Sequence, residues 1–428
     1  MKILYIAHRI PYPPNKGDKI RSFNEIKYLS KVHEIHLACL ADDPNDLKYE
    51  EDLKGFCKST NVVLINPRSA KLESAIRLFS IKPLSISYFY SRKLQRTIDH
   101  LLSTNEYDAI FCFSSPMAEY VFRSAVLSRQ SIVRSQIAKD GQPSTMDYKL
   151  STLSHRPMAK LIMDFVDVDS DKWTQYSKYA GFPKSWIYSV EGRRLAGYET
   201  NVAERFDHCI FVTEAEERIF RGRNPHIKNI SVISNGVNLD YFYPTFSQEQ
   251  TTSNQQSIIV FTGAMDYYAN VDGVVWFTKE ILPLIKREIP AIQFYIVGSN
   301  PTKEVLSLSS NNSVTVTGYV PDTREYLERA TVVVVPLRIA RGIQNKILEA
   351  MAMGVPVVAT PRAFEGIEAK PERDLILGEG VEKIAKGVIK LMKEASLRKS
   401  LGDNARRIIE KNYCWTKNLG RFNSILTK

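Results

Sequence analysis

The stretch PLRIARGIQNKILEAMAMGVPVVAT, residues 336–360, decides the fold class of this chain. It follows the short β-branched run 332–335, which predicts a buried strand. Apolar residues then recur at helical spacing, Gly354 suits the end of that helix, and a second β-branched run begins at Val355. A strand, a helix and a strand in succession predict a pair of parallel strands, and ligands bind at the carboxyl ends of such strands.

The loop at this strand end is basic, and the helix after it has a positive N-terminus, so the segment suits anion binding. Arg338 and Arg341 lie in the loop, and Lys346 lies in the helix. Glu349 occupies an otherwise apolar part of the helix, which is an unusual place for a carboxylate. Two interpretations are open: an ion pair with Lys346 one turn back, or a carboxylate that accepts hydrogen bonds from vicinal sugar hydroxyls.

This stretch resembles the donor-site signature of glycosyltransferase family 4, whose members have two domains and the GT-B fold. In that family, LEAMAxGxPVVAT follows a Glu-x7-Glu pair, and the resemblance implies that Glu349 binds the ribose of a nucleotide sugar. The first position of the pair is Arg341 here, a departure that fits sugar transferases associated with bacterial exopolysaccharide production. The donor-binding residues implied in this way are Gly17, Gly263, Arg338, Arg341, Asn345, Lys346 and Glu349.

The composition of the chain indicates which binding partners and which cellular compartment to expect. A chain of 428 residues predicts two or three domains, and a net charge of +11 favours anionic partners such as phosphate-bearing substrates. The five cysteines are scattered without metal spacing, which predicts free thiols in a reducing cytoplasm. The apolar runs are strand-sized, so we expect no membrane span and no signal peptide. No nucleic-acid motif is present, and nucleic acid is not expected as a partner.

The N-terminal loop HRIPYPPNKGDK, residues 8–19, lies between a predicted strand at 2–7 and a predicted helix from Ile20. This is a second arrangement that suits anions. The family has a glycine-rich loop here that faces the donor phosphates and the acceptor, and Gly17 matches its glycine. A plain turn is the alternative, since a lone glycine is a weak signal.

The string MDFVDVDSDKW, residues 163–173, resembles the same subgroup of sugar transferases. In the wider family a His-Asp pair at the end of this strand faces the donor sugar, and Asp167 and Asp169 occupy that place. With Glu349 they form the predicted catalytic set. A helix cap ranks second, and a divalent metal held by Asp-x-Asp, as in GT-A enzymes, ranks third. We therefore expect no obligatory metal or other cofactor, with the nucleotide sugar acting as co-substrate.

The segment from Arg68 to Arg96 mixes basic residues with bulky apolar ones. This composition predicts contact with an acidic membrane surface and a peripheral position on the inner face of the cell membrane. The alternative is a pair of ordinary surface helices whose apolar faces join the core.

Two polar stretches organise the rest of the chain. We interpret residues 129–157 as an insertion, and residues 245–257 as the boundary between the two domains. The expected organisation is an acceptor-side Rossmann-like domain at 1–244, a nucleotide-sugar donor domain at 258–411, and a segment at 412–428 that packs back on the first domain.

The loop FTGAMDYYANVDG, residues 261–273, lacks the Arg and Lys that many family members place after this glycine to hold the pyrophosphate. The phosphate charge is therefore assigned to Arg338, Arg341 and Lys346. We therefore expect a retaining glycosyltransferase that moves a sugar from a nucleotide donor to a saccharide or lipid-linked acceptor in exopolysaccharide or cell-surface glycan synthesis. The alternatives are another GT-B enzyme, such as a nucleotide-sugar epimerase, and a non-catalytic partner subunit.

Overall fold

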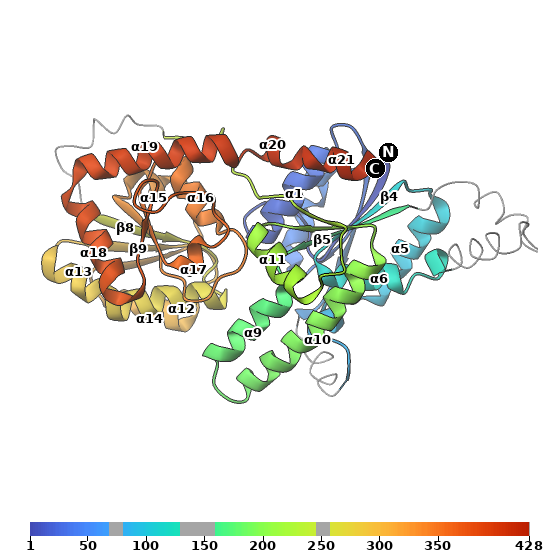
Figure 1. The fold of residues 1–428 in the computed structure, drawn as a ribbon, viewed down its shortest axis with the longest axis horizontal. Helices are drawn as coiled ribbons and strands as arrows, with labels where there is room; N and C mark the ends of the chain where they lie inside the picture. Colours follow the sequence, from blue (N-terminus) through green and yellow to red (C-terminus); the bar gives the residue numbers. More distant parts are fainter. Residues whose placement is uncertain (68–79, 129–158, 245–256, 428) are drawn as a thin grey trace, which may run out of the picture. The chain divides into compact units, whose positions relative to one another are not determined.

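The computed structural model of the chain describes residues 1–67, 80–128, 159–244 and 257–427. It divides into two compact units, which are described separately (Figure 1). The first unit comprises Met1–Phe211, Glu217–Val232 and Phe422–Lys428, and the second comprises Val212–Glu216 and Ile233–Arg421. The predicted insertion at 129–157 and nearly all of the predicted domain boundary at 245–257 lie outside the described residues.

The first unit is built on a parallel sheet of seven strands in the order β3-β2-β1-β4-β5-β6-β7. The strands are β1 (Lys2–Ala7), β2 (Glu34–Ala41), β3 (Ser59–Leu64), β4 (Ala109–Phe113), β5 (Lys160–Val166), β6 (His208–Phe211) and β7 (Ile230–Val232). The helices are α1 (Gly17–Leu29), α2 (Glu50–Leu53), α4 (Leu84–Tyr88), α5 (Arg92–Thr104), α6 (Ala118–Phe122), α9 (Asp169–Tyr179), α10 (Lys184–Arg205), α11 (Glu214–Arg223) and α21 (Arg421–Thr427).

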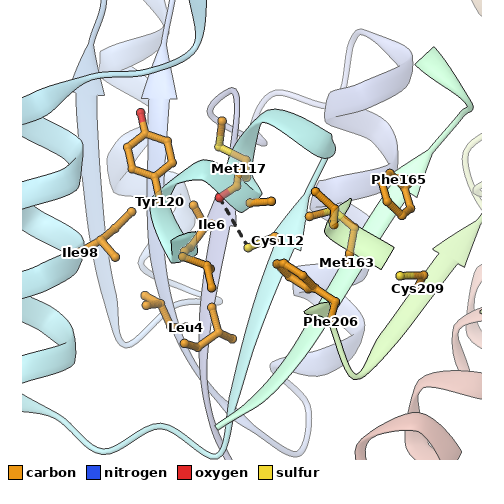
Figure 2. Packing of buried hydrophobic residues seen from close by; sticks show 14 of the residues in the cluster. Leu4, Ile6, Ile98, Cys112, Met117, Tyr120, Met163, Phe165, Phe206 and Cys209 are labelled. Atoms are coloured by element: carbon orange, nitrogen blue, oxygen red, sulfur yellow. Dashed lines mark hydrogen bonds between the residues drawn. The ribbon is translucent and has the colours of Figure 1, made fainter. Parts of the chain in front are cut away.

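Central strands of this sheet are continuous apolar runs because both of their faces are covered. Leu4 and Ile6 of β1 are fully buried, and they share one hydrophobic cluster with Cys112 of β4 and Met163 of β5 (Figure 2). Ile98 of α5 joins the same cluster, so the apolar stripe of that helix covers one face of the sheet.

The second unit is a parallel sheet of six strands in the order β10-β9-β8-β11-β12-β13. The strands are β8 (Ile258–Thr262), β9 (Gln293–Val297), β10 (Val314–Gly318), β11 (Val332–Val335), β12 (Val357–Ala359) and β13 (Ile376–Leu377). The helices are α12 (Tyr268–Trp276), α13 (Leu282–Glu288), α14 (Lys303–Ser307), α15 (Arg324–Arg329), α16 (Asn345–Ala352), α17 (Pro361–Phe364), α18 (Gly380–Lys393), α19 (Ala395–Asn412) and α20 (Trp415–Leu419). Two parallel, helix-flanked sheets confirm the α/β class that the alternating pattern predicts.

The C-terminal segment divides between the units. Residues up to Arg421 group with the second unit, whereas the predicted ranges treat 412–428 as one segment. The ring of Phe422 in α21 packs edge-on against Phe111 of β4, with centroids 5.5 Å apart. The ammonium of Lys160 donates to the carbonyl of Ile425 at 2.6 Å, so α21 is fixed to the first sheet.

The segment expected to contact a membrane is only partly described, because residues 68–79 lie outside the described ranges. In the described part, α5 buries Leu94, Ile98 and Leu101, and the rings of Tyr88 and Phe89 pack against the core. Most apolar side chains of residues 84–96 therefore face the core, as in the alternative interpretation, whereas Ile81 is 93% exposed. Contact of the segment with a membrane stays a prediction. No helix in the described ranges has both the length and the apolar character needed to cross a membrane.

Candidate functional site

The predicted site residues divide between the two units. Gly17, Asp167 and Asp169 belong to the first unit, and all the others belong to the second. Each group is described within its own unit.

Three neighbouring strands of the second sheet lead into glycine at their carboxyl ends, the edge at which parallel sheets bind ligands. Gly263 follows β8, Gly298 follows β9 and Gly318 closes β10, and all three have positive φ, at 155°, 151° and 71°. A Cβ on Gly298 would lie 1.7 Å from the carbonyl oxygen of Gly263, so only glycine allows this backbone approach. The edge therefore presents backbone at the place where a ligand can come close.

Lys346 of α16 lies against this glycine edge. Its Nζ donates to Asn270 Oδ1 at 2.6 Å and lies 4.3 Å from the centroid of the Phe261 ring. A Cβ placed on Gly263 would be 3.0 Å from the same Nζ. Burial lowers the pKa of Lys346 from its ordinary value of 10.5 to about 7, and the charge of Glu349 opposes that shift. The helix thus brings an amine to the loop that lacks the usual Arg and Lys.

Asn270 fixes that amine, a role that the residue's place in the sequence does not reveal. It is buried in α12 and uses both ends of its amide. Nδ2 donates to the carbonyl of Ala264 at 2.8 Å while Oδ1 accepts from Lys346. A buried amide in a largely apolar helix is the sequence signal that points to such a positioning contact.

Glu349 lies one turn further along α16. Burial raises the pKa of its carboxyl from 4.5 to about 7, and the Lys346 charge lowers it in part. Among the described residues, no basic group lies within ion-pair distance of this carboxylate, and no side chain donates to it. Because Lys346 bonds to Asn270, the two charged groups of α16 interact only through space. The carboxylate thus keeps its acceptor positions, as the ribose-binding interpretation requires.

The two arginines of the loop have acidic partners. Arg338 Nε donates to Asp272 Oδ2 at 2.9 Å, and a second guanidinium nitrogen pairs with the same carboxylate. Arg341 Nη1 lies 3.2 Å from Glu365 Oε1, and its side chain is nearly buried. Of the three basic residues assigned to the phosphates, only Lys346 has no carboxylate within ion-pair distance in the described structure.

Asn345 is the first residue of α16. Its Oδ1 accepts a hydrogen bond from Asn235 Nδ2 at 3.1 Å. The turn before the helix contains Gly342 with φ of 62°, and Gln344 is extended, so α16 begins at Asn345. The structure therefore places Lys346 in the first turn of the helix, where backbone amides remain unpaired along the axis.

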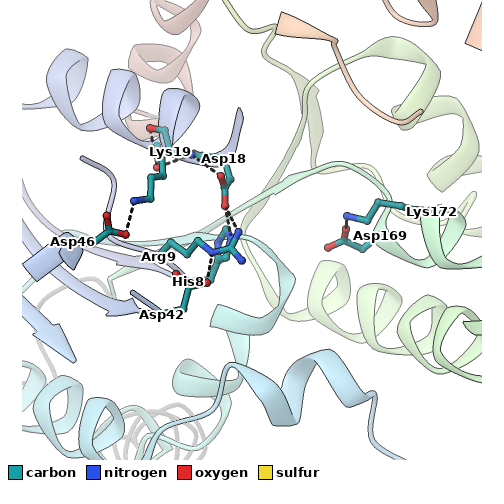
Figure 3. Close-up of polar contacts among 9 residues, drawn as sticks. His8, Arg9, Asp18, Lys19, Asp42, Asp46, Asp169 and Lys172 are labelled. Atoms are coloured by element: carbon teal, nitrogen blue, oxygen red, sulfur yellow. Dashed lines mark hydrogen bonds and ion pairs between the residues drawn. The ribbon is translucent and has the colours of Figure 1, made fainter. Parts of the chain in front are cut away.

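In the first unit, Gly17 begins α1 beside a network of paired charges (Figure 3). Asp18 accepts from Arg9 Nη1 at 2.7 Å and lies 3.1 Å from His8 Nε2. Lys19 Nζ lies 2.6 Å from Asp46. The polar neighbours of Gly17 thus already bind one another, and the loop is held by these pairs.

Arg21 of α1 lies four residues after Gly17, and its side chain is fully buried. It donates through Nε and Nη2 to Asp164 Oδ2 at 2.9 and 2.6 Å, and Nε lies 3.0 Å from Glu25 Oε1. The Tyr5 hydroxyl completes the group by donating to Glu25 at 2.6 Å. Arg21 therefore ties α1 to β5 in the core of the unit.

Asp167 and Asp169 follow β5 directly. Val166 at the strand end has φ of 66°, which is strained for a β-branched residue and marks a sharp change of direction. Burial raises the pKa of Asp167 to about 6, and Lys172 opposes that shift. Asp169 is the first residue of α9 and forms an ion pair with Lys172 (Figure 3). In the described ranges, no group of three or more His, Cys, Asp or Glu side chains is placed to hold a metal ion.

Part of the chain matches a known protein family. Residues 256–394 match the family described as Glycosyl transferases group 1. An uncharacterized 44.6 kDa protein in the cps region of Klebsiella pneumoniae is 21% identical over 425 residues and covers 96% of both chains. An uncharacterized glycosyltransferase of Methanocaldococcus jannaschii, MJ1069, is 22% identical over 53% of this chain and 60% of its own.

Solved structures share the fold at low identity. Anabaena Alr3699/HepE in complex with UDP-glucose has a TM-score of 0.66 at 14% identity, covering 100% of this chain and 99% of that one. Sucrose-phosphate synthase from Thermosynechococcus elongatus has a TM-score of 0.68 at 16% identity, covering 99% and 98%. The two Rossmann-like units are therefore those of the GT-B fold.

The fold and the family match together define a glycosyltransferase of the GT-B type. Residues 256–394, which include Gly263, Lys346 and Glu349, are the part of the chain that matches the group 1 glycosyl transferases.

Proposed function

We propose that this protein is a retaining glycosyltransferase that transfers a sugar from a nucleotide donor to a saccharide or lipid-linked acceptor during cell-surface glycan assembly. The Klebsiella relative lies in a cps region, which supports the glycan context. Structures of Anabaena Alr3699/HepE with UDP and with UDP-glucose support a nucleoside diphosphate sugar as donor.

The observation that carries the proposal is the position of Lys346 beside Gly263, with Glu349 one turn away on the same helix. The amine lies at the glycine edge where strand ends receive a ligand, and hydrogen bonding to Asn270 fixes it there. A diphosphate at this edge would restore the positive charge that burial disfavours. The Glu349 carboxylate would accept hydrogen bonds from two ribose hydroxyls.

In this proposal the protein positions the reactants and stabilises charge, and it needs no nucleophile of its own. Lys346 offsets the negative charge that develops on the leaving diphosphate. The leaving phosphate oxygen takes the proton from the acceptor hydroxyl on the same face of the sugar, which retains the anomeric configuration. Asp167 and Asp169 would face the donor sugar, and Arg338, Arg341 and Asn345 would support the loop around the phosphates.

Titration with uridine, UMP and UDP tests the donor assignment. We expect UDP to bind more tightly than uridine, with Lys346→Met removing most of that difference and the exposed control Lys303→Gln on α14 keeping it. Equal affinities for all three ligands in the unaltered protein would contradict a diphosphate site.

Turnover assays distinguish a glycosyltransferase from an epimerase and from a non-catalytic subunit. Release of UDP from a nucleotide sugar should require a saccharide or lipid-linked acceptor. An epimerase would convert the donor without any acceptor, and a non-catalytic subunit would bind the donor without converting it.

A further inference from the structure

The helical hairpin formed by α9 and α10 ends in a group of exposed aromatic side chains. The loop between the two helices lies away from the sheet of the first unit (Figure 1). Around this turn, the exposed fractions of Tyr179, Phe182 and Trp186 are 51%, 86% and 48%. Packing in the hydrophobic core does not explain these three large rings within eight residues, because none of them belongs to the core. These residues, with Lys178 and Lys184, are called here the hairpin tip.

A second aromatic group holds the hairpin together behind its tip. The ring centroids of Trp173 and Tyr188 are 5.2 Å apart, and Tyr176 packs within 5.8 Å of Trp173. The helices also approach closely at Gly192, where a Cβ would lie 2.9 Å from the carbonyl oxygen of Ser170. The hairpin is therefore stabilised by residues other than those of the tip, and the exposed rings remain for another contact.

The charged residues of the hairpin tip are all positive. Residues 172–190 contain three lysines and no aspartate or glutamate. Lys178 and Lys184 are exposed and have no acidic partner among the described residues. Lys172, further back, is paired with Asp169. A tip with unpaired cations and exposed amphipathic rings matches the anionic interface of a lipid bilayer better than it matches a hydrophobic groove on a protein.

We propose that the hairpin tip docks into the interface of an acidic membrane. Lys178 and Lys184 would contact lipid phosphates, while Phe182 and Trp186 would lie at the level where headgroups meet acyl chains. This surface differs from residues 84–104, whose apolar side chains face the core. The proposal stands apart from the transfer reaction, because docking requires neither donor nor acceptor.

Flotation of the full chain with vesicles tests the docking. We expect binding to phosphatidylcholine vesicles that contain phosphatidylglycerol, weaker binding to phosphatidylcholine alone, and release by salt. Lys178→Gln and Lys184→Gln should each lower the partition coefficient about fivefold. The double variant Phe182→Ser/Trp186→Ser should abolish binding. The matched controls Lys303→Gln and Leu306→Ser, at exposed positions of α14, should bind as the unaltered chain does.

Fluorescence quenching locates the contact. Lipids brominated near the headgroup should quench tryptophan emission of the bound protein, and Trp186→Phe should remove that quenching while binding persists. Unchanged quenching in Trp186→Phe, or equal loss of binding in the α14 controls, would overturn the proposal. If the double variant instead alters only the oligomeric state in light scattering, the tip is a protein interface and the membrane assignment is wrong. UDP binding by each variant, measured in parallel, shows whether the proposed donor site is intact.

Discussion

Replacing Lys346 with methionine should stabilise the fold while it removes diphosphate binding. Lys346 is held at a glycine edge where burial lowers its pKa from 10.5 to about 7. A shift of that size is a penalty of about 4 kcal/mol on the folded state at pH 7. Methionine has a similar length and no charge to bury, so the substitution removes the penalty.

Two losses reduce the expected gain. Asn270 Oδ1 loses the donor that lies 2.6 Å away, and the cation over the Phe261 ring disappears. Each loss costs about 1 kcal/mol. The net expectation is a rise of about 2 kcal/mol in the free energy of unfolding at pH 7.

The pH dependence provides an internal check. The folded pKa of Lys346 lies below its unfolded value, so between about pH 7 and pH 10.5 the unfolded chain binds more protons than the folded one. The unaltered protein therefore gains stability relative to the variant as pH rises, by at most about 1.4 kcal/mol per pH unit. The advantage of methionine should be nearly gone at about pH 9.

Denaturant unfolding at pH 7, 8 and 9, with and without UDP, measures both effects. UDP should stabilise the unaltered protein more than Lys346→Met, because the variant lacks the amine that we propose for the diphosphate. A variant that is less stable than the unaltered protein at pH 7, or a stability difference that does not change with pH, would refute the reasoning. Lys303→Gln serves as the control for removing a lysine charge at an exposed site.

Three further outcomes are expected. Glu349→Gln should weaken donor binding by about 1 to 3 kcal/mol in calorimetry while the protein stays folded, and an unchanged affinity would remove Glu349 from the ribose site. Arg338→Ala should weaken UDP binding less than Lys346→Ala does, because Asp272 already neutralises the guanidinium; a larger loss in Arg338→Ala would reverse that order. EDTA should leave transfer activity intact if Asp167 and Asp169 face the sugar, whereas loss of activity with rescue by Mn²⁺ would favour the metal interpretation.

The sequence predicts the strand and helix order of the donor unit well because its signals are local. The β-branched run 332–335 is β11, and the apolar spacing after it gives α16. Apolar spacing alone would count Ile343 as part of the helix, yet α16 begins at Asn345. The turn at Gly342 and Gln344 is fixed by backbone angles that apolar spacing does not report. Local periodicity thus predicts the elements better than their ends.

Contacts between residues that are far apart in the sequence could not be predicted from local patterns. Arg21 follows the N-terminal loop directly, and nothing near it in the sequence indicates that it pairs with Asp164, which is 143 residues away. Asn270 and Lys346 are 76 residues apart, and the helix motif gives no sign that an amide from α12 will hold the amine. Lys346 was assigned to the phosphates because the motif places it at a strand end. The structure adds that β8 and β11 are neighbours in a parallel sheet, which brings their carboxyl ends together.

The arrangement of α16 has a consequence for how a donor would be held. Burial raises the pKa of Glu349 and lowers that of Lys346, each to about 7, so near neutral pH each group of the free site carries its charge only part of the time. A diphosphate favours the charged lysine, and ribose hydroxyls favour the charged carboxylate. Binding both parts of a nucleoside diphosphate would therefore transfer a proton from Glu349 to Lys346 with little net exchange with solvent. A ligand that offers only ribose or only phosphate restores one charge without the other, so the site would favour the complete nucleoside diphosphate over either fragment.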